Sequence, residues 1–195
     1  NTAFMKFSEM DYAIAKDAFD RYFERFDNGI FINEAAYYNA VSSLKIGDTV
    51  SAIINYKRLL DISSYSPYRE NALIFLARMA YNNLNYDQSN QYYSRLLDCV
   101  SSNSIKREAI IRLMLGYIDS PIESVKYAKQ VVNLEKIDDW LLSKAYIIIA
   151  REEFTSGNYA KSSYTFEKVI SLSDYDEGAE AKYHLAYLTY LDDDF

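Results

Sequence analysis

A pattern of small, aromatic and apolar residues recurs at a nearly constant interval along this chain of 195 residues. Its copies begin near Tyr12, Thr49, Tyr86 and Tyr159, which are 37, 37 and 73 residues apart. The last interval is two steps, because a degenerate copy from Ser120 to Val132 lies between them. A period in this range is typical of solenoids built from stacked helical hairpins, which grow without a single central core.

Each copy has the residue spacing of an amphipathic helix. A small residue is followed four places later by an aromatic residue, and three and four places further on by two mostly apolar residues. This spacing predicts a helix whose small column lets a neighbouring helix approach closely. The small column contains Ala15, Ala52, Ser89, Ser124 and Ser162; the aromatic column contains Phe19, Tyr56, Tyr93 and Phe166, with Ala128 in the degenerate copy.

A second apolar segment lies upstream of each copy, for example "NALIFLARMAY" and "KAYIIIAREEF". Short stretches such as "KIGD" and "TSGN" separate the two segments and favour a turn, since Gly, Asn and Asp tolerate turn geometry and cap helices. We therefore predict an all-α solenoid of antiparallel helix-turn-helix repeats. It is expected to be a single array with a half-repeat at 1–29, repeats at about 30–67, 68–103, 104–137 and 138–175, and a half-repeat at 176–195 that ends at Phe195.

The composition agrees with long helices and excludes several classes of partner. Half of the residues are hydrophobic, while only five are Gly and two are Pro. A net charge of −7 argues against binding to nucleic acid, whose phosphates favour a basic surface. The longest apolar runs, such as "AYIIIA", are too short to form a transmembrane segment. Cys99 is the only cysteine, which leaves no intrachain disulfide, and we expect it to be a small buried or half-buried apolar residue.

In these columns the sequence resembles the tetratricopeptide repeat (TPR) family. The resemblance covers essentially the whole chain, with small residues also in the first helices at Ala40, Ala77, Ala150 and Ala186. It departs from the family at Trp140, which lies outside the early tryptophan column, and at Met114, which stands where a small residue is expected. The resemblance implies a right-handed superhelix, no enzymatic activity, and a concave groove lined by first helices that accepts a protein or peptide partner.

The groove positions of the family carry over to a set of aromatic, aliphatic and arginine residues. Arg78 and Arg151 occupy the same place in their repeats, and an arginine pair flanked by tyrosines could bind an acidic or carboxylate-bearing segment. The alternative is that these arginines form salt bridges with neighbouring Glu or Asp and that the tyrosines pack between repeats. The candidate groove residues are Tyr37, Val41, Ile74, Arg78, Tyr81, Ile147, Arg151, Phe154, Tyr183, Tyr187 and Tyr190.

Other functions fit the sequence less well. The family's lysine and asparagine clamp for a C-terminal carboxylate is absent, since the corresponding pairs of positions hold Tyr37 and Val41, Ile74 and Arg78, and Ile147 and Arg151. Glycan binding by the tyrosines is a minor alternative, because the repeats lack insertions that would build a sugar pocket. A structural or assembly role in a bacterial cell envelope and a cytoplasmic adaptor role are both open, with the periplasm or envelope slightly favoured.

We find no motif for catalysis, a metal or a cofactor. The sole histidine, His184, lies within a helical pattern and is interpreted as a packing or surface residue rather than a general base. The acidic run "LDDDF" is expected to be a turn, Asp139 to cap a helix, and Ser120, Pro121 and Glu123 to form a capping box. The chain starts with Asn in the middle of a repeat, so we expect the natural N-terminus to be missing. We expect the last helix, Glu177 to Leu191, to fray or to self-associate.

Overall fold

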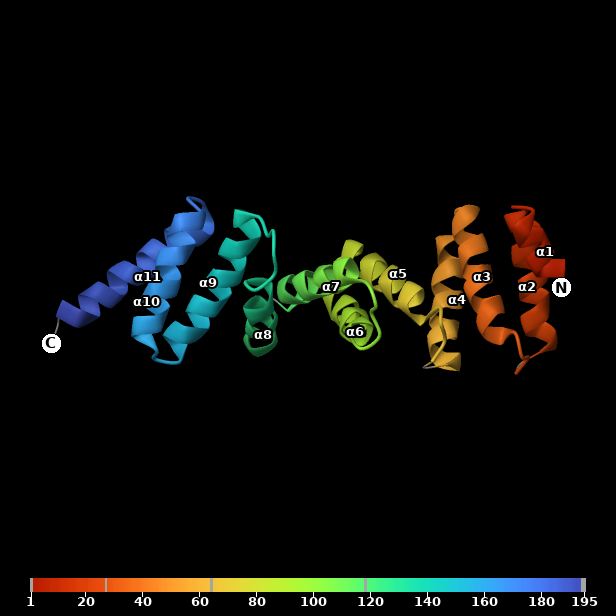
Figure 1. Ribbon diagram of the computed structural model, residues 1–195, viewed down its shortest axis with the longest axis horizontal. Coiled ribbons are helices and arrows are strands. Elements are labelled where there is room, and N and C mark those ends of the chain that lie inside the picture. Colours follow the sequence, from red (N-terminus) through yellow and green to blue (C-terminus); the bar gives the residue numbers. More distant parts are fainter. Residues whose placement is uncertain (1, 27, 64, 118, 194–195) are drawn as a thin grey trace. The chain divides into compact units, whose positions relative to one another are not determined.

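The computed structural model is built from α-helices and describes residues 2–26, 28–63, 65–117 and 119–193 (Figure 1). Within these ranges eleven helices and no strands are present. The helices are α1 (Thr2–Ser8), α2 (Tyr12–Arg25), α3 (Ile32–Lys45), α4 (Thr49–Ile62), α5 (Arg69–Asn82), α6 (Tyr86–Leu97), α7 (Asn103–Gly116), α8 (Pro121–Val131), α9 (Asp139–Thr155), α10 (Tyr159–Leu172) and α11 (Asp176–Asp193). The predicted all-α fold is confirmed.

The helices pair as the repeat pattern predicted. Each odd-numbered helix from α1 to α9 packs against the even-numbered helix that follows it. Four of the five second helices, α2, α4, α6 and α10, begin at the four residues from which the sequence pattern was counted. The small and aromatic columns therefore lie at fixed depths in these helices, which is why they recur in the sequence.

Four hairpins turn in the same way. Met10, Gly47, Leu84 and Gly157 adopt positive φ angles of 61, 82, 58 and 75° at equivalent positions of the turn. In each case the next residue's N–H donates to a carbonyl five residues earlier, as in Asp48 N to Ser43 O at 2.8 Å. This is the Schellman ending of a helix, which satisfies carbonyls that would otherwise lack a donor. The following Asp48 and Asn85 then cap the next helix by accepting from Ser51 N and Gln88 N.

The small and aromatic columns of the repeat form the core. Ala15, Ala52, Ser89 and Ser162 are all fully buried, and so are the first-helix alanines Ala40, Ala77 and Ala150. The aromatic column is at most 4% exposed at Phe19, Tyr56, Tyr93 and Phe166. Small residues thus bring the helices together, and the aromatic rings fill the space beside each contact.

The chain forms two compact units, Asn1–Val100 (unit 1, with α1–α6) and Ser101–Phe195 (unit 2, with α7–α11). Each unit has its own packed helices. The expected repeat boundaries of a single array stay a prediction, and Phe195, where the last repeat was expected to end, lies outside the described residues.

Several local predictions were wrong. Asp138 rather than Asp139 caps α9, because its Oδ1 accepts from Leu141 N at 2.8 Å. Ser120 is at the N-cap position of α8 with Pro121 after it, but its side chain makes no capping bond. Glu123 instead forms an ion pair with Lys126, three residues later in the same helix, at 3.3 Å.

Two further predictions concern single sites in the chain. Cys99 is exposed rather than buried, because it lies just beyond the end of α6. The start of the acidic run "LDDDF" is helical, since α11 continues to Asp193, whereas residues 194 and 195 lie outside the described ranges.

Candidate functional site

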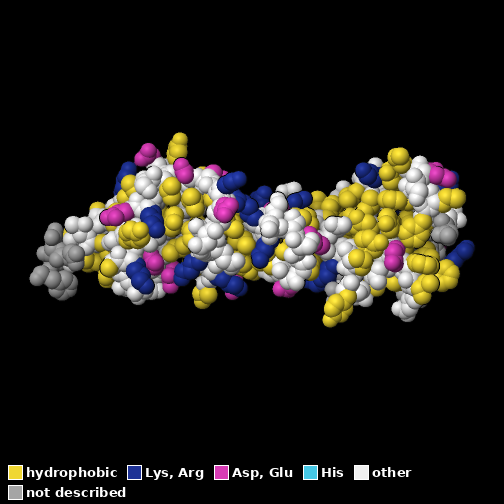
Figure 2. Space-filling view, in the orientation of Figure 1, with side chains coloured by type: hydrophobic (Ala, Val, Ile, Leu, Met, Phe, Trp, Pro, Cys, Tyr) yellow, Lys and Arg dark blue, Asp and Glu magenta, His cyan; other side chains and the backbone are white. Residues whose placement is uncertain are grey.

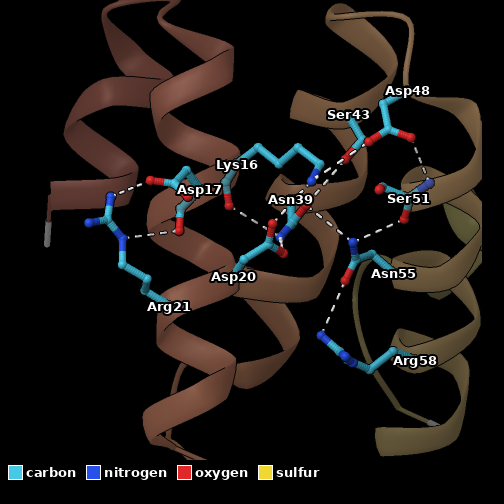
Figure 3. A network of polar contacts seen from close by, with 10 residues as sticks. All are labelled: Lys16, Asp17, Asp20, Arg21, Asn39, Ser43, Asp48, Ser51, Asn55 and Arg58. Atoms are coloured by element: carbon cyan, nitrogen blue, oxygen red, sulfur yellow. Dashed lines mark hydrogen bonds and ion pairs between the residues drawn. The ribbon is translucent and has the colours of Figure 1, made fainter.

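A buried polar network joins three helices of unit 1 (Figure 3). Its centre is Asn39 of α3, which is fully buried. The Nδ2 of Asn39 donates to Asp20 Oδ1 of α2 at 2.7 Å, while its Oδ1 accepts from Ser43 Oγ at 3.2 Å and from Asn55 Nδ2 of α4 at 3.1 Å. Because the amide is satisfied from both sides, it fixes the register of α2, α3 and α4.

Charged side chains close the edges of this network. Lys16 Nζ lies 3.0 Å from Asp20 and 3.6 Å from Asp48. The hydrogen bond to Asp20 raises the pKa of Lys16, and hydrogen bonds from Ser51 lower the pKa of Asp48. At the other edge, the Arg58 guanidinium donates to Asn55 Oδ1 at 3.3 Å and lies 4.1 Å from the Phe23 ring centre. Lys16 is paired with two carboxylates and Arg58 contacts an amide and an aromatic ring, so these contacts support the fold.

A signal for this network is present in the sequence, at positions where the repeats differ from one another. The residue 37 places after Asn39 is Leu76, and the residue 37 places after Asn55 is Tyr92. An asparagine in a column that is otherwise apolar indicates a buried amide, whose partners must come from neighbouring helices. The network is built from residues that the copies do not share, so a comparison of shared columns does not find it.

The predicted groove residues of unit 1 lie on the first helices α3 and α5. Tyr37 stacks on Tyr68 with ring centres 4.2 Å apart, and Asn71 Nδ2 of α5 donates to the Tyr37 hydroxyl at 3.2 Å. Tyr37 therefore bridges two neighbouring first helices. Burial, together with the nearby Tyr37, raises the pKa of Tyr56 to about 12, so this ring is a neutral part of the core.

The remaining predicted residues of unit 1 differ in exposure. Val41, Ile74 and Tyr81 are half-buried, and the Tyr81 ring lies edge-on to Tyr86. Arg78 is exposed on α5. Arg78 therefore lies on the same helix as the half-buried Ile74 and Tyr81.

In unit 2, one predicted groove residue is wrong and a second is occupied. Ile147 is 2% exposed and packs in the core with Phe166, Val169 and Leu188, because its side chain points between α9, α10 and α11. Arg151 forms a two-pronged bond to Glu180 of α11, with Nε and Nη2 each 2.5 Å from a carboxylate oxygen. The alternative interpretation, a salt bridge to a neighbouring acid, is therefore the one that Arg151 adopts.

A second ion pair runs between the same two helices. Lys144 of α9 pairs with Glu177 of α11, whose side chain is 9% exposed. Burial raises the pKa of this carboxyl, but the bond to Lys144 and the charges of Lys144 and Arg151 outweigh burial, so the pKa of Glu177 is lowered. Two first helices are thus joined by two charge-assisted contacts.

His184 is a packing residue, as expected. Its ring stacks on Phe166 with centres 4.9 Å apart and an interplanar angle of 8°, and it also contacts Phe154. Phe154 in turn lies against Tyr159 and Tyr187, so this predicted groove residue is half-buried in an aromatic cluster. In the part of the chain that the structure describes, no group of three His, Cys, Asp or Glu side chains could hold a metal ion.

Three exposed predicted residues lie on one face of α11. Tyr183, Tyr187 and Tyr190 are 68%, 42% and 63% exposed. With Ala186, they follow the spacing of three and four residues that places side chains on the same side of a helix. Ala186 is exposed although the equivalent alanines of α3, α5 and α9 are fully covered by the second helix of their hairpin. The face of α11 therefore has the shape that accepts a helix elsewhere in this chain.

Unit 1 contains an open cleft that sequence reasoning missed. It has a volume of about 880 Å³ and lies between α1, α2 and α3. Its aromatic walls include Phe4, Phe19 and Tyr22, with Arg21 and Arg25 on α2 and Glu34 on α3. Hydrophobic side chains also gather on the surface over α2–α4 (Figure 2). Among the described residues no helix has the length and apolar character of a membrane span.

Comparison with known proteins identifies the fold. No protein-family profile matches the chain. A TPR repeat-containing protein of Methanocaldococcus jannaschii is 24% identical over 180 residues, which cover 84% of this chain and 30% of that protein. The chain therefore spans less than a third of the length of this curated relative.

Two solved structures are similar to this chain. The C-terminal part of a TPR repeat-containing protein from Cytophaga hutchinsonii matches 97% of this chain and 74% of that structure, with a TM-score of 0.50 and 17% identity. The structure of MamA matches 93% of this chain and 98% of that structure, with a TM-score of 0.49 and 16% identity. Together with the hairpins, the buried small columns and the repeated turns, the likenesses to the Methanocaldococcus jannaschii and Cytophaga hutchinsonii proteins show that the chain is built from TPR-like helical repeats.

Proposed function

We propose that this chain is a non-enzymatic scaffold that holds a partner peptide or helix on the surface of its first helices. The observation that carries the proposal is the exposed face of α11, formed by Tyr183, Ala186, Tyr187 and Tyr190. Tyrosine supplies a large, rigid contact area at a small cost in conformational entropy, and contiguous exposed apolar surface commonly marks an interaction site.

The paired charges of unit 2 support a binding role in a specific way. The bonds from Lys144 and Arg151 to α11 hold that helix in a fixed position beside α9. A surface held in place in advance loses little entropy when a partner binds, so more of the contact energy appears as affinity. Arg151 contributes to this surface as a support of α11, rather than as a free receptor for a carboxylate.

The test is selection of ligands from a display library of helical and extended peptides, with the purified chain as bait. Selected peptides should bind the unaltered chain and lose at least about tenfold in affinity to a Tyr183→Ser, Tyr187→Ser variant, since each buried aromatic contact is worth 1 kcal/mol or more. The matched control is Tyr164→Ser with Tyr175→Ser, which removes two exposed tyrosines at other places in unit 2.

Two outcomes would count against the proposal. Peptides whose binding is equally strong in both double variants would place the interface away from α11. If no peptide is enriched on the unaltered chain, although circular dichroism shows that it is folded, the first-helix surface is not a peptide receptor.

A further inference from the structure

We propose that one ridge of α4 in unit 1 is a docking site for a partner helix that carries a row of aliphatic side chains and a carboxylate near one end of that row. The α4 ridge is the row of residues spaced four apart along this helix, Val50, Ile54, Arg58 and Ile62. It lies on a second helix, so the inference goes beyond the proposed function, which concerns the first-helix face of α11.

The aliphatic members of the α4 ridge are exposed to solvent. Val50, Ile54 and Ile62 are 70%, 53% and 36% exposed, and hydrophobic side chains gather on the surface over this part of unit 1 (Figure 2). Residues four apart form a ridge on a helix, and in the commonest class of helix packing such ridges fit beside ridges of the same spacing on a second helix. The α4 ridge therefore has the form that a helix with its own four-residue row packs against.

The equivalent positions of the neighbouring second helices have no large aliphatic side chain. By the 37-residue period, Val50 and Ile54 correspond to four exposed residues, Ala13 and Asp17 in α2 and Asp87 and Gln91 in α6. These positions face solvent in all three helices, so packing within the unit does not require an aliphatic residue there. Exposed apolar surface of this kind commonly marks an interaction site.

Arg58 lacks the carboxylate that its equivalent in α2 has. The equivalent residue is Arg21, which pairs with Asp17, four residues earlier, at 2.5 Å. In α4 the place of that acid is taken by Ile54. The Arg58 guanidinium contacts an amide and an aromatic ring (Figure 3), and no carboxylate among the described residues pairs with it. Its planar donors suit a carboxylate, so we infer that the partner supplies an Asp or Glu.

A small pocket adjoins the charged part of the ridge. It has a volume of about 200 Å³ and is lined by Arg58 and Ile62 of α4, by Phe23 and Phe26 at the C-terminal end of α2, and by Ile32 of α3. Its walls are apolar except for the guanidinium, so it favours an apolar side chain that lies next to a carboxylate. The chemistry of the α4 ridge therefore fits an acidic amphipathic helix rather than a basic one.

The test uses a display library of helical peptides, with leucine fixed at three positions spaced four apart, the other positions randomised, and the purified chain as bait. We expect the selected helices to be enriched in Asp or Glu near one end of the leucine row. Their affinity should fall at least about tenfold for Val50→Gln, Ile54→Gln, because two buried aliphatic contacts are lost. The matched control is Ile14→Gln with Ile122→Gln, which removes two exposed aliphatic side chains elsewhere and should leave affinity unchanged.

A double-mutant cycle tests the carboxylate. One selected helix is compared with a version whose acidic residue is replaced by glutamine, on the unaltered chain and on Arg58→Gln, which keeps a donor for the Asn55 amide. We expect each single change to weaken binding about tenfold. The two changes together should weaken it little further, because both remove the same contact.

Three results would overturn the proposal. They are no enriched helix on a chain that circular dichroism shows to be folded, unchanged affinity for Val50→Gln, Ile54→Gln, and additive losses in the cycle with Arg58→Gln. A dimer in sedimentation experiments that Val50→Gln, Ile54→Gln abolishes would assign the ridge to a second copy instead. Selected helices should bind Tyr183→Ser, Tyr187→Ser as tightly as the unaltered chain, which would show that the α4 ridge and the face of α11 are separate sites.

Discussion

At the scale of single residues, the turn position with positive φ is occupied by glycine in two hairpins and by larger residues in two others. Gly47 and Gly157 adopt this conformation without steric cost, whereas Met10 and Leu84 do not, because a Cβ atom crowds the backbone there. Leu84 is also 72% exposed, so its side chain contributes little burial in return. The repeat keeps the turn geometry even where the residue type opposes it, which shows that hairpin packing determines the conformation.

We therefore expect Leu84→Gly to stabilise unit 1 by about 0.5–1 kcal/mol, since the relief of strain exceeds the entropy that glycine loses on folding. Gly157→Ala should destabilise unit 2 by about 1 kcal/mol, although a Cβ there meets no atom within 4 Å. Thermal unfolding followed by circular dichroism measures both changes. Leu84→Ala is the control, because it removes the same side chain but keeps the strain, and a gain from this variant would contradict the explanation.

A second residue-scale prediction concerns the buried amide of Asn39. Asn39→Leu introduces the residue that the next repeat has at this place, but it leaves Asn55, Ser43 and Asp20 without their partner. We expect a loss of about 2–3 kcal/mol, which is the cost of leaving buried polar groups unsatisfied. Urea denaturation measures it. Asn71→Leu, which removes one exposed hydrogen bond to Tyr37, is the matched control and should cost much less.

At the scale of helices, the contact between α9 and α11 depends on the charge of Glu177. Its pKa is lowered in the folded protein, so the ionised carboxylate favours folding. This contribution is complete above the unfolded pKa, near 4.5, and is lost as the pH falls through the folded value. We expect the thermal midpoint of unit 2 to fall between about pH 5 and pH 3, and to fall less in Glu177→Gln.

The partner of Glu177 provides a control. In Lys144→Met the carboxyl loses its bonded cation, so its pKa moves upward from the lowered value of the unaltered chain. Less stability should then be lost as the pH falls from about pH 5 to pH 3. Identical pH profiles for the unaltered chain and for Lys144→Met would show that the pair does not control the contact.

The helices were also the level at which prediction from sequence was most successful. The repeated blocks were correctly predicted to be the second helices of hairpins, now α2, α4, α6 and α10, because the repeated columns report a local spacing that every copy obeys. The candidate site was predicted less well. Whether Ile147 faces solvent or the core, and whether Arg151 is bound by Glu180, depends on contacts between different helices that a single repeat does not contain. The cleft of unit 1 was missed because it is lined by side chains of three different helices, whose relative placement the repeat columns do not give.

At the scale of the whole molecule, each unit has its own core and can respond separately to a change in stability. One core cluster of unit 1 gathers around Phe19 and Ala35, and one of unit 2 around Phe166 and Val169. In repeat proteins stability is approximately a sum of local terms and nearest-neighbour contacts, so cooperativity can be lost between segments. The chain offers an intrinsic probe of this behaviour, because its only tryptophan, Trp140, lies in α9 of unit 2.

The final prediction uses this probe with Asn39→Leu, which lies in unit 1. Far-UV circular dichroism reports helices in both units, whereas the fluorescence of Trp140 reports unit 2. We expect the variant to lower the thermal midpoint of the part of the circular dichroism signal that comes from unit 1. The fluorescence midpoint should stay within about 1 °C of its original value, because the loss of about 2–3 kcal/mol of stability is confined to unit 1. Equal shifts of both signals would mean that the two cores unfold as one cooperative body, and Leu84→Gly would then have to raise the Trp140 midpoint as well.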